Sequence, residues 1–144
     1  MSSPERFKVP VGIFIMLRKD DKVLLQLRQN CSFAGYWGFV GGHLDGGEQI
    51  ISAAIREAKE EIGIDIRAED LTLKAVRHSN MNTEYLHFYF ECRKWSGTIE
   101  NKEPEKCVRL EWHEWNNPPE KSCYYIKDAI ANINAGITFF EDKF

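Results

Sequence analysis

Residues 42–64, GHLDGGEQIISAAIREAKEEIGI, constrain this chain more than any other stretch, because a glycine-rich loop runs directly into a helix-forming sequence. Glu60 and Glu61 follow Glu57 by three and four positions, so a helix places the three carboxylates side by side. Like charges at this spacing repel each other unless a cation lies among them. Oxygen ligands alone suit a hard divalent cation, which is Mg²⁺ or, as the alternative, Mn²⁺. The stretch therefore predicts a helix with a metal-binding face.

Another side of the same helix is apolar, and the glycines before it allow a tight turn. We expect the helix to run from about residue 48 to residue 62, with Gly63 just after its end. The glycine pairs at 41–42 and 46–47 let the backbone turn sharply and approach a ligand closely. The apolar positions that share one face, and so are expected to pack, are Ile51, Ala54, Ile55, Ala58 and Ile62.

The spacing of this stretch resembles the Nudix box, G-x5-E-x7-R-E-U-x-E-E-x-G-U, in which U is a bulky aliphatic residue. Ala58 departs from the pattern at a packing position, so the departure leaves the metal-binding positions intact. The fixed positions are occupied by Gly42, Glu48, Arg56, Glu57, Glu60, Glu61 and Gly63, and Ile64 fits the last U. The alternative reading of this stretch is an acidic helix that faces solvent. A lone E-x-x-E-E motif would favour that alternative, but the complete box does not.

The resemblance implies a hydrolase that needs a divalent metal and cleaves a diphosphate linkage in a nucleoside diphosphate joined to another group. A metal ion neutralises the phosphate oxygens and promotes attack by water. By position in the box, Glu57, Glu60 and Arg56 are the expected catalytic residues, with Arg56 holding the carboxylates by charge-assisted hydrogen bonds. The general base varies among such enzymes and is left unassigned. The metal ligands that the resemblance implies are the Gly42 carbonyl, Glu48, Glu57, Glu60 and Glu61.

A further acidic residue is expected from a later loop, because many relatives use one. Glu105, in the segment NKEPEK, is our candidate for a metal ligand, and Glu103 is the second choice. For either residue the alternative is a solvated loop carboxylate. Arg28, at the end of a predicted strand, is a candidate bidentate donor to a substrate phosphate, and its alternative is an ordinary surface arginine.

The residues just before the box are candidates for binding the base of a nucleotide. Tyr36, Trp37 and Phe39 offer aromatic faces on which a base stacks, although burial in the core is the alternative for Trp37 and Phe39. His43 lies in the phosphate loop and is a candidate donor to a phosphate oxygen. Stacking tolerates any base, so these aromatics alone predict modest selectivity.

The order of predicted elements is strands, the box helix, more strands and a final helix, which indicates an α+β fold with a mixed β-sheet. The resemblance implies more, namely the Nudix fold, an α/β/α sandwich. The final helix is expected at residues 124–135, capped by Gly136, and the aromatic tail at 137–144 is expected to pack against the domain or a partner. The predicted extended segments are residues 11–17, 23–28, 37–40, 64–66, 71–78, 85–92, 95–99 and 108–115.

Length and charge limit the classes of protein to consider. The 144 residues suit one domain, so we expect a single Nudix domain over residues 1–144. A net charge of -3 argues against nucleic-acid binding, and no apolar run approaches membrane length. The four cysteines form no C-x-x-C pair, so reduced thiols in a cytoplasmic protein are expected. The sequence does not determine the oligomeric state, and a homodimer is possible.

Three functions compete at this point. The leading hypothesis is hydrolysis of a (deoxy)nucleoside triphosphate to the monophosphate and pyrophosphate, because residues 37–48 and the later EPEKC segment resemble small MutT-like Nudix proteins. The second is cleavage of ADP-ribose or another nucleotide sugar. The third is a non-catalytic Nudix module that only binds nucleotides, against which the intact carboxylates argue.

Overall fold

The strands and helices follow the chain in nearly the predicted order. A computed structural model describes residues 4–81 and 83–144. A short 3₁₀ turn at Ala68–Asp70 precedes the fourth strand. The elements are β1 (Val11–Lys19), β2 (Lys22–Arg28), β3 (Trp37–His43), α1 (Ile50–Ile62), β4 (Leu71–Ser79), β5 (Tyr85–Cys92), β6 (Cys107–Glu114), α2 (Tyr124–Asn134) and β7 (Phe139–Glu141).

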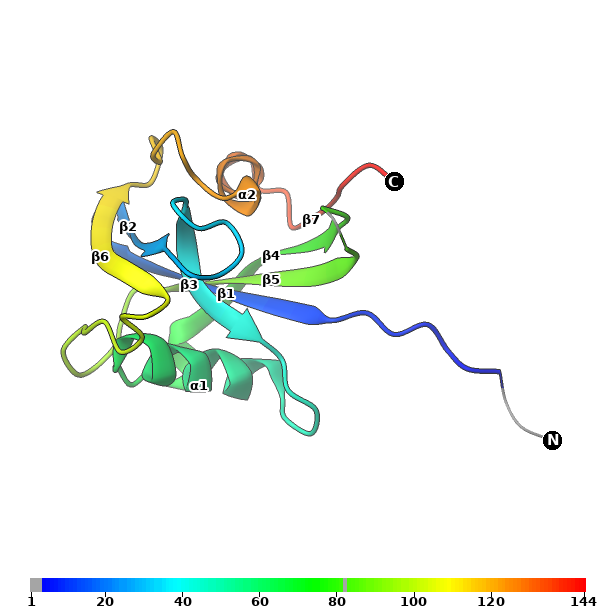
Figure 1. Cartoon of the computed structure of the whole chain (residues 1–144), viewed down its shortest axis with the longest axis horizontal. Helices are drawn as coiled ribbons and strands as arrows, with labels where there is room; N and C mark the ends of the chain where they lie inside the picture. Colours follow the sequence, from blue (N-terminus) through cyan, green and yellow to red (C-terminus); the bar gives the residue numbers. More distant parts are fainter. Residues whose placement is uncertain (1–3, 82) are drawn as a thin grey trace.

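The strands form one mixed sheet in the order β6-β2-β3-β1-β5-β4-β7. β1 pairs with β5 in parallel and β4 pairs with β7 in parallel, while the other neighbouring strands are antiparallel. Figure 1 shows the result: β1 and β3 cross the centre of the sheet, and β3 leads directly into the loop before α1. The end of β3 and the start of α1 are therefore held at the middle of the molecule.

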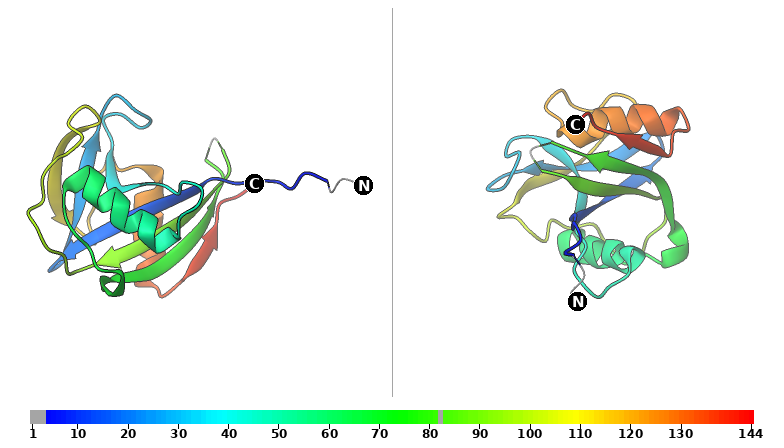
Figure 2. Two further views of the ribbon diagram at one scale, coloured as in Figure 1. Left: turned by 90° about the horizontal axis from the view of Figure 1, so that it is seen from below. Right: turned by 90° about the vertical axis from the view of Figure 1, so that its right-hand side faces the viewer.

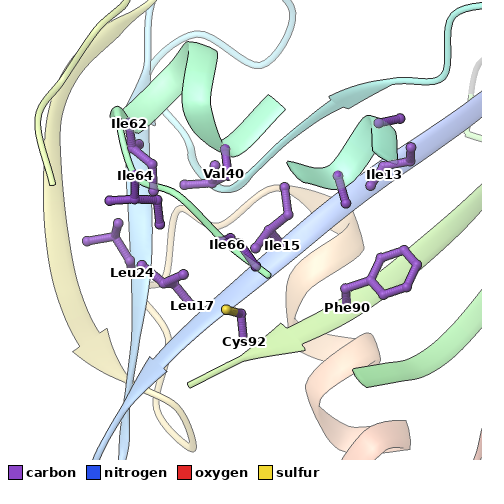
Figure 3. Packing of buried hydrophobic residues seen from close by; sticks show 13 residues of the cluster. Ile13, Ile15, Leu17, Leu24, Val40, Ile62, Ile64, Ile66, Phe90 and Cys92 are labelled. Atoms are coloured by element: carbon purple, nitrogen blue, oxygen red, sulfur yellow. The ribbon is translucent and has the colours of Figure 1, made fainter. Parts of the chain in front are cut away.

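The two helices cover opposite faces of the sheet, which confirms the α/β/α sandwich (Figure 2). Side chains alternate along a strand, so β1 serves both faces. Ile13, Ile15 and Leu17 pack in the cluster beneath α1, which Figure 3 shows from close by. Phe14 and Met16 pack in the second cluster, beneath α2. Both helices are thus fixed by buried apolar contacts with the same central strand.

Helix α1 begins two residues later than the sequence predicts. Its N-terminal flanking residue, Gln49, is extended, with φ -76° and ψ 151°. Glu48 lies outside the helix because its carboxylate accepts hydrogen bonds from the Asp45 amide at 2.8 Å and from Arg56. At the other end Gly63 has φ 76° and donates to the Lys59 carbonyl, so the predicted C-terminal glycine is confirmed.

Two other expectations need correction. Residues 95–99 do not form a strand: Ser96 makes one isolated bridge with Asp65, and Gly97, with φ 91°, interrupts the extended conformation. In the aromatic tail, Phe140 packs against the cluster beneath α2, whereas Phe139 and Phe144 are exposed. The tail packs through β7, which pairs in parallel with β4.

All four cysteines are free. Neither α-helix of the described chain has the length and apolar character needed to cross a membrane.

Candidate active site

The glycines at the end of β3 allow the backbone to approach the carboxylates of α1. A Cβ atom at Gly42 would lie 2.2 Å from the carboxyl carbon of Glu57, so only glycine fits there. The amide of Gly41 donates to Glu61 Oε2 at 3.1 Å. The glycine-rich loop and the acidic face of α1 therefore form one surface, as the box spacing predicts.

Arg56 ties the acidic residues together. Its guanidinium donates to both Glu48 oxygens, at 3.0 and 2.8 Å. It also donates to Glu57 Oε1 at 2.9 Å and to Glu60 Oε2 at 3.2 Å. The His43 carbonyl accepts a further hydrogen bond at 3.2 Å. The bond with Glu48 is the main cause that raises the pKa of Arg56, so this side chain stays charged and serves as the counter-cation of the carboxylates.

Glu57 and Glu61 lie in surroundings that disfavour their charged forms. Burial raises the pKa of Glu61 to about 8, and the negative charges of Glu57 and Glu103 add to the effect. Burial is also the main cause that raises the pKa of Glu57, which Arg56 partly offsets. The sequence suggests exposed carboxylates, and this holds only for Glu60, whose side chain is 53% exposed. A cation bound between these two partly buried carboxylates would favour their charged forms.

Glu103, rather than Glu105, is the loop carboxylate beside α1. Glu103 is half-buried and lines the same cavity as Glu57, Glu60 and Glu61, while Glu105 is exposed and does not line it. The reason is a tight turn, in which the Glu103 carbonyl accepts from the amides of Lys106 and Cys107, at 2.9 Å each. Glu105 lies within this turn, and its backbone carbonyl accepts a hydrogen bond from the Asn30 side chain. We therefore transfer the proposed role of Glu105 to Glu103.

These four carboxylates line an acidic cavity of about 440 Å³. Within the described residues, no three His, Cys, Asp or Glu side chains already surround a single point at ligand distance. The donor set nevertheless fits a hard divalent ion, because oxygen ligands from α1 and from the loop before β6 converge on one space. Arg56 already pairs with Glu57 and Glu60 and so offsets part of their negative charge.

A second cavity, which we call the aromatic cavity, adjoins the first. It has a volume of about 320 Å³ and lies between the sheet and the start of α2. The residues that line both cavities are Arg28, Ser32, Gly41 and His43, so the two spaces form one continuous cleft. The aromatic and imidazole side chains that line the aromatic cavity include Phe14, Phe39, Tyr85, His87, Tyr124 and Tyr125.

Three of the five predicted substrate-binding residues line this cleft. Phe39 is among the residues that line the aromatic cavity, but its side chain is only 1% exposed and belongs to the cluster beneath α2, as its alternative of core burial predicts. Arg28 and His43 lie where the two cavities meet. Trp37 does not line either cavity, because it lies further back along β3 and is buried, 8% exposed, in the cluster beneath α2. Tyr36 is half-exposed and lies near Lys121, outside the lining of both cavities. The structure therefore supports no base contact by Trp37 or Tyr36.

A family model of the NUDIX domain matches residues 6–129, which is most of the chain. This chain belongs to the Nudix family. The match confirms the resemblance carried by the box. Nudix hydrolases as a class use divalent metals, which agrees with the oxygen-rich donor set described above.

Curated Nudix relatives match parts of the chain. The dihydroneopterin triphosphate diphosphatase of Escherichia coli is 37% identical over 67 residues, which are 46% of this chain and 45% of that protein. An uncharacterized Nudix hydrolase of Bacillus subtilis is 30% identical over 106 residues, 71% of this chain and 64% of that protein. The ADP-ribose pyrophosphatase of Methanocaldococcus jannaschii is 38% identical over 61 residues, 42% of this chain and 36% of that protein. The chain thus spans less than two thirds of the length of each of these relatives.

Solved structures agree on the fold. The MutT NUDIX hydrolase of Burkholderia pseudomallei has a TM-score of 0.80 at 25% identity, covering 87% of this chain and 98% of that one. The MutT protein of Methanosarcina mazei has a TM-score of 0.75 at 16% identity, covering 90% and 97%. The Nudix fold, inferred from the box, is confirmed.

Sequence reasoning missed Phe14, Tyr85, Tyr124 and Tyr125 in the aromatic cavity of this Nudix protein. For His78 and His87 the sequence predicts ordinary sheet residues, with lining of the pocket as the alternative, and the alternative holds for His87. Phe14 comes from β1, Tyr85 and His87 from β5, and Tyr124 and Tyr125 from the start of α2. These positions are far apart in the chain, and no spacing rule connects them. The one available signal was alternation along β5, which places Tyr85 and His87 on the same side.

Proposed function

We propose that this Nudix protein hydrolyses a heterocyclic triphosphate, most simply a nucleoside triphosphate, to the monophosphate and pyrophosphate, with Mg²⁺ as the required ion. The observation that carries the proposal is the continuous cleft, in which an aromatic cavity opens onto an acidic one through Arg28 and His43. A base in the aromatic cavity leaves its phosphate chain pointing toward the carboxylates of α1.

The volumes and side chains of the cleft support this arrangement. Ligand pockets usually occupy about 300–1,000 Å³, and the aromatic cavity, at about 320 Å³, suits one heterocycle rather than an extended second group. Aromatic faces stack on a base. The guanidinium of Arg28 and the imidazole of His43 line the junction of the two cavities, and both groups are of a kind that donates hydrogen bonds to phosphate oxygens, which supports this role.

The chain's own residues organise the reaction. Glu57, Glu61 and Glu103 would supply oxygen ligands for the ion, which when bound would neutralise phosphate charge and promote attack by water. Arg56 fixes Glu48 and Glu57 in place. One water adds to the α- or β-phosphorus, and the bridging oxygen between them leaves with the other phosphate group. Either attack yields a monophosphate and pyrophosphate.

A second candidate is the cleavage of ADP-ribose or a nucleotide sugar. It is supported by the relative from Methanocaldococcus jannaschii, which is named as an ADP-ribose pyrophosphatase. The leading candidate is supported by the relative from Escherichia coli, which is named for a heterocyclic triphosphate.

The test is hydrolysis over a panel of nucleoside triphosphates, ADP-ribose and nucleotide sugars, with Mg²⁺ or with a chelator. We expect Mg²⁺-dependent turnover of triphosphates that falls by orders of magnitude in Glu57→Gln and Glu60→Gln. Turnover confined to ADP-ribose or nucleotide sugars would favour the second candidate. Full activity in both variants would remove the box carboxylates from catalysis.

A further inference from the structure

The wall of the aromatic cavity contains a buried imidazole that the folded chain does not use. His87 lies on β5, is 5% exposed and lines the cavity. Its Nδ1 atom is buried and has no hydrogen-bond partner among the described residues. Buried polar side-chain atoms in native proteins nearly always have a partner, so an unpaired one calls for an explanation.

The fold makes room for this imidazole and holds it. A Cβ atom at Gly12 would lie 2.7 Å from His87 Cδ2, so the absence of a side chain at residue 12 leaves space for the ring. The ring of Phe14 contacts it edge-on, with 4.9 Å between centroids, and the ring of Tyr85 lies 5.4 Å away. His87 is therefore a fixed polar group within an apolar, aromatic wall.

The imidazole is neutral at physiological pH. Burial is the main cause that lowers the pKa of His87 to about 4, and the positive charge of Arg77, its partner across β4 and β5, acts in the same direction. A neutral imidazole has one N–H donor and one acceptor nitrogen. These are the groups that a heterocyclic base offers along its own edge.

We infer that His87 is a specificity-determining residue, which hydrogen-bonds an edge of the substrate's heterocycle in the aromatic cavity. The inference rests on the proposed function and adds to it, because stacking on Phe39 or Tyr124 accepts any base. A site built to hydrogen-bond a substrate group rejects an analogue that lacks it, since the buried protein group is then left unpaired. One base, or a small set that shares an edge pattern, is therefore preferred over the others.

The experiment measures two quantities for the common bases: kcat/KM for the nucleoside triphosphates and equilibrium binding of the nucleoside monophosphates. The variants are His87→Leu, which removes both nitrogens, and His87→Asn, which keeps a donor and an acceptor near the position of Nδ1. His113→Leu is the matched control, because His113 is also partly buried but packs against Trp37 and does not line the cavity.

We expect the wild type to prefer its best base at least about tenfold, the effect of one net hydrogen bond in a buried site. His87→Leu should lose that preference in both assays, His87→Asn should recover part of it, and His113→Leu should retain it. Gly12→Ala, which displaces the ring without removing it, should also reduce the preference.

Failure of this inference differs from failure of the proposed function. A wild type that hydrolyses no triphosphate overturns the proposed function, while the monophosphate binding still decides the role of His87. The inference is overturned if wild type and His87→Leu show the same preference among bases, or if His87→Leu loses affinity equally for every base. It is also overturned if the wild type binds no nucleoside monophosphate.

Discussion

Arg56 and Glu61 both belong to the acidic site, but their surroundings differ: Arg56 stays charged, whereas burial disfavours the charged form of Glu61. The Arg56 guanidinium forms ion pairs with the carboxylates of Glu48, Glu57 and Glu60. Glu61 is largely shielded from solvent, and its side chain accepts a hydrogen bond from the Gly41 amide. The box spacing predicts that these residues meet, but it does not predict how deeply each side chain is buried.

The first prediction concerns Glu61 and pH. Burial raises its pKa from 4.5 to about 8, so the folded chain binds this proton more tightly than the unfolded chain. The resulting stability is complete below about pH 4.5 and is lost as the pH rises through about 8. In a chelator, Tm should therefore fall from pH 5 to pH 8, and Glu61→Gln should reduce that fall.

Thermal melts of wild type, Glu61→Gln and the surface variant Glu120→Gln check this prediction. Glu120 is exposed and remote from the cavity, so its substitution should keep the wild-type slope. Some slope should remain in Glu61→Gln, because burial also raises the pKa of Glu57. Identical slopes for wild type and Glu61→Gln would contradict the assignment.

The second prediction concerns Arg56. Its planar guanidinium bridges Glu48, Glu57 and the His43 carbonyl at once, which a lysine ammonium cannot do. Arg56→Lys should lower kcat/KM and metal affinity by about 10–100-fold, the usual effect of losing a group that orients metal ligands. Activity is measured as a function of Mg²⁺ concentration. Wild-type activity and Mg²⁺ dependence in this variant would show that the bridging has no role.

At the scale of elements, periodicity in the sequence predicts strands and helices, whereas the sequence of a loop does not predict where its side chains lie. The β1–β2 hairpin, β5, α1 and its C-terminal glycine were predicted, because alternation and helical spacing are local properties. The direction of side chains in the loop before β6 depends on the turn at Glu103, which the sequence NKEPEK does not reveal. For Trp37 the sequence offers two roles, base binding and burial in the core, and the second is correct because the start of α2 packs over that part of β3.

The third prediction separates the two loop carboxylates. Glu103 lines the acidic cavity and its charge adds to the raised pKa of Glu57 and Glu61, whereas Glu105 is exposed. Glu103→Gln should lower kcat about tenfold or more or raise the Mg²⁺ requirement, since one acid–base or ligand group is worth that much. Glu105→Gln should behave as wild type. The two variants are compared in one Mg²⁺ titration, and equal kinetics would remove Glu103 from the site.

At the scale of the whole molecule, one buried arginine joins the last two elements to the sheet. Arg77 of β4, 4% exposed, donates to Asp128 of α2 and to Asp142 after β7, at 2.9 Å each. Asp142 also accepts from the Asn80 amide at 2.9 Å. Met81 and Thr83, which line the rim of the aromatic cavity, lie close to Asn80 in the chain. The contact of Asp142 with Asn80 therefore supports one side of that cavity. No sequence pattern indicates this link, because Arg77 is 51 positions from Asp128 and 65 positions from Asp142 in the chain.

The fourth prediction tests that link. Asp142→Asn should lower the free energy of unfolding by about 1–3 kcal/mol, because hydrogen bonds to a buried charge are lost. The same variant should raise KM more than it lowers kcat, since the cavity rim loosens while the carboxylates stay in place. Asp128→Asn is the control: its side chain is 51% exposed, so the loss should be smaller. Denaturant unfolding measures the change in the free energy of unfolding, and steady-state kinetics measure the changes in KM and kcat. Equal effects of the two variants would contradict the link.

The central claim is that the cleft directs water to a triphosphate so that pyrophosphate is released. The most direct measurement is product identification after hydrolysis of the best triphosphate in ¹⁸O-labelled water with Mg²⁺. We predict a monophosphate and pyrophosphate as the primary products, with one ¹⁸O atom in the monophosphate for attack at the α-phosphorus or in pyrophosphate for attack at the β-phosphorus. Release of orthophosphate as the primary product, or turnover of nucleotide sugars alone, would contradict the claim.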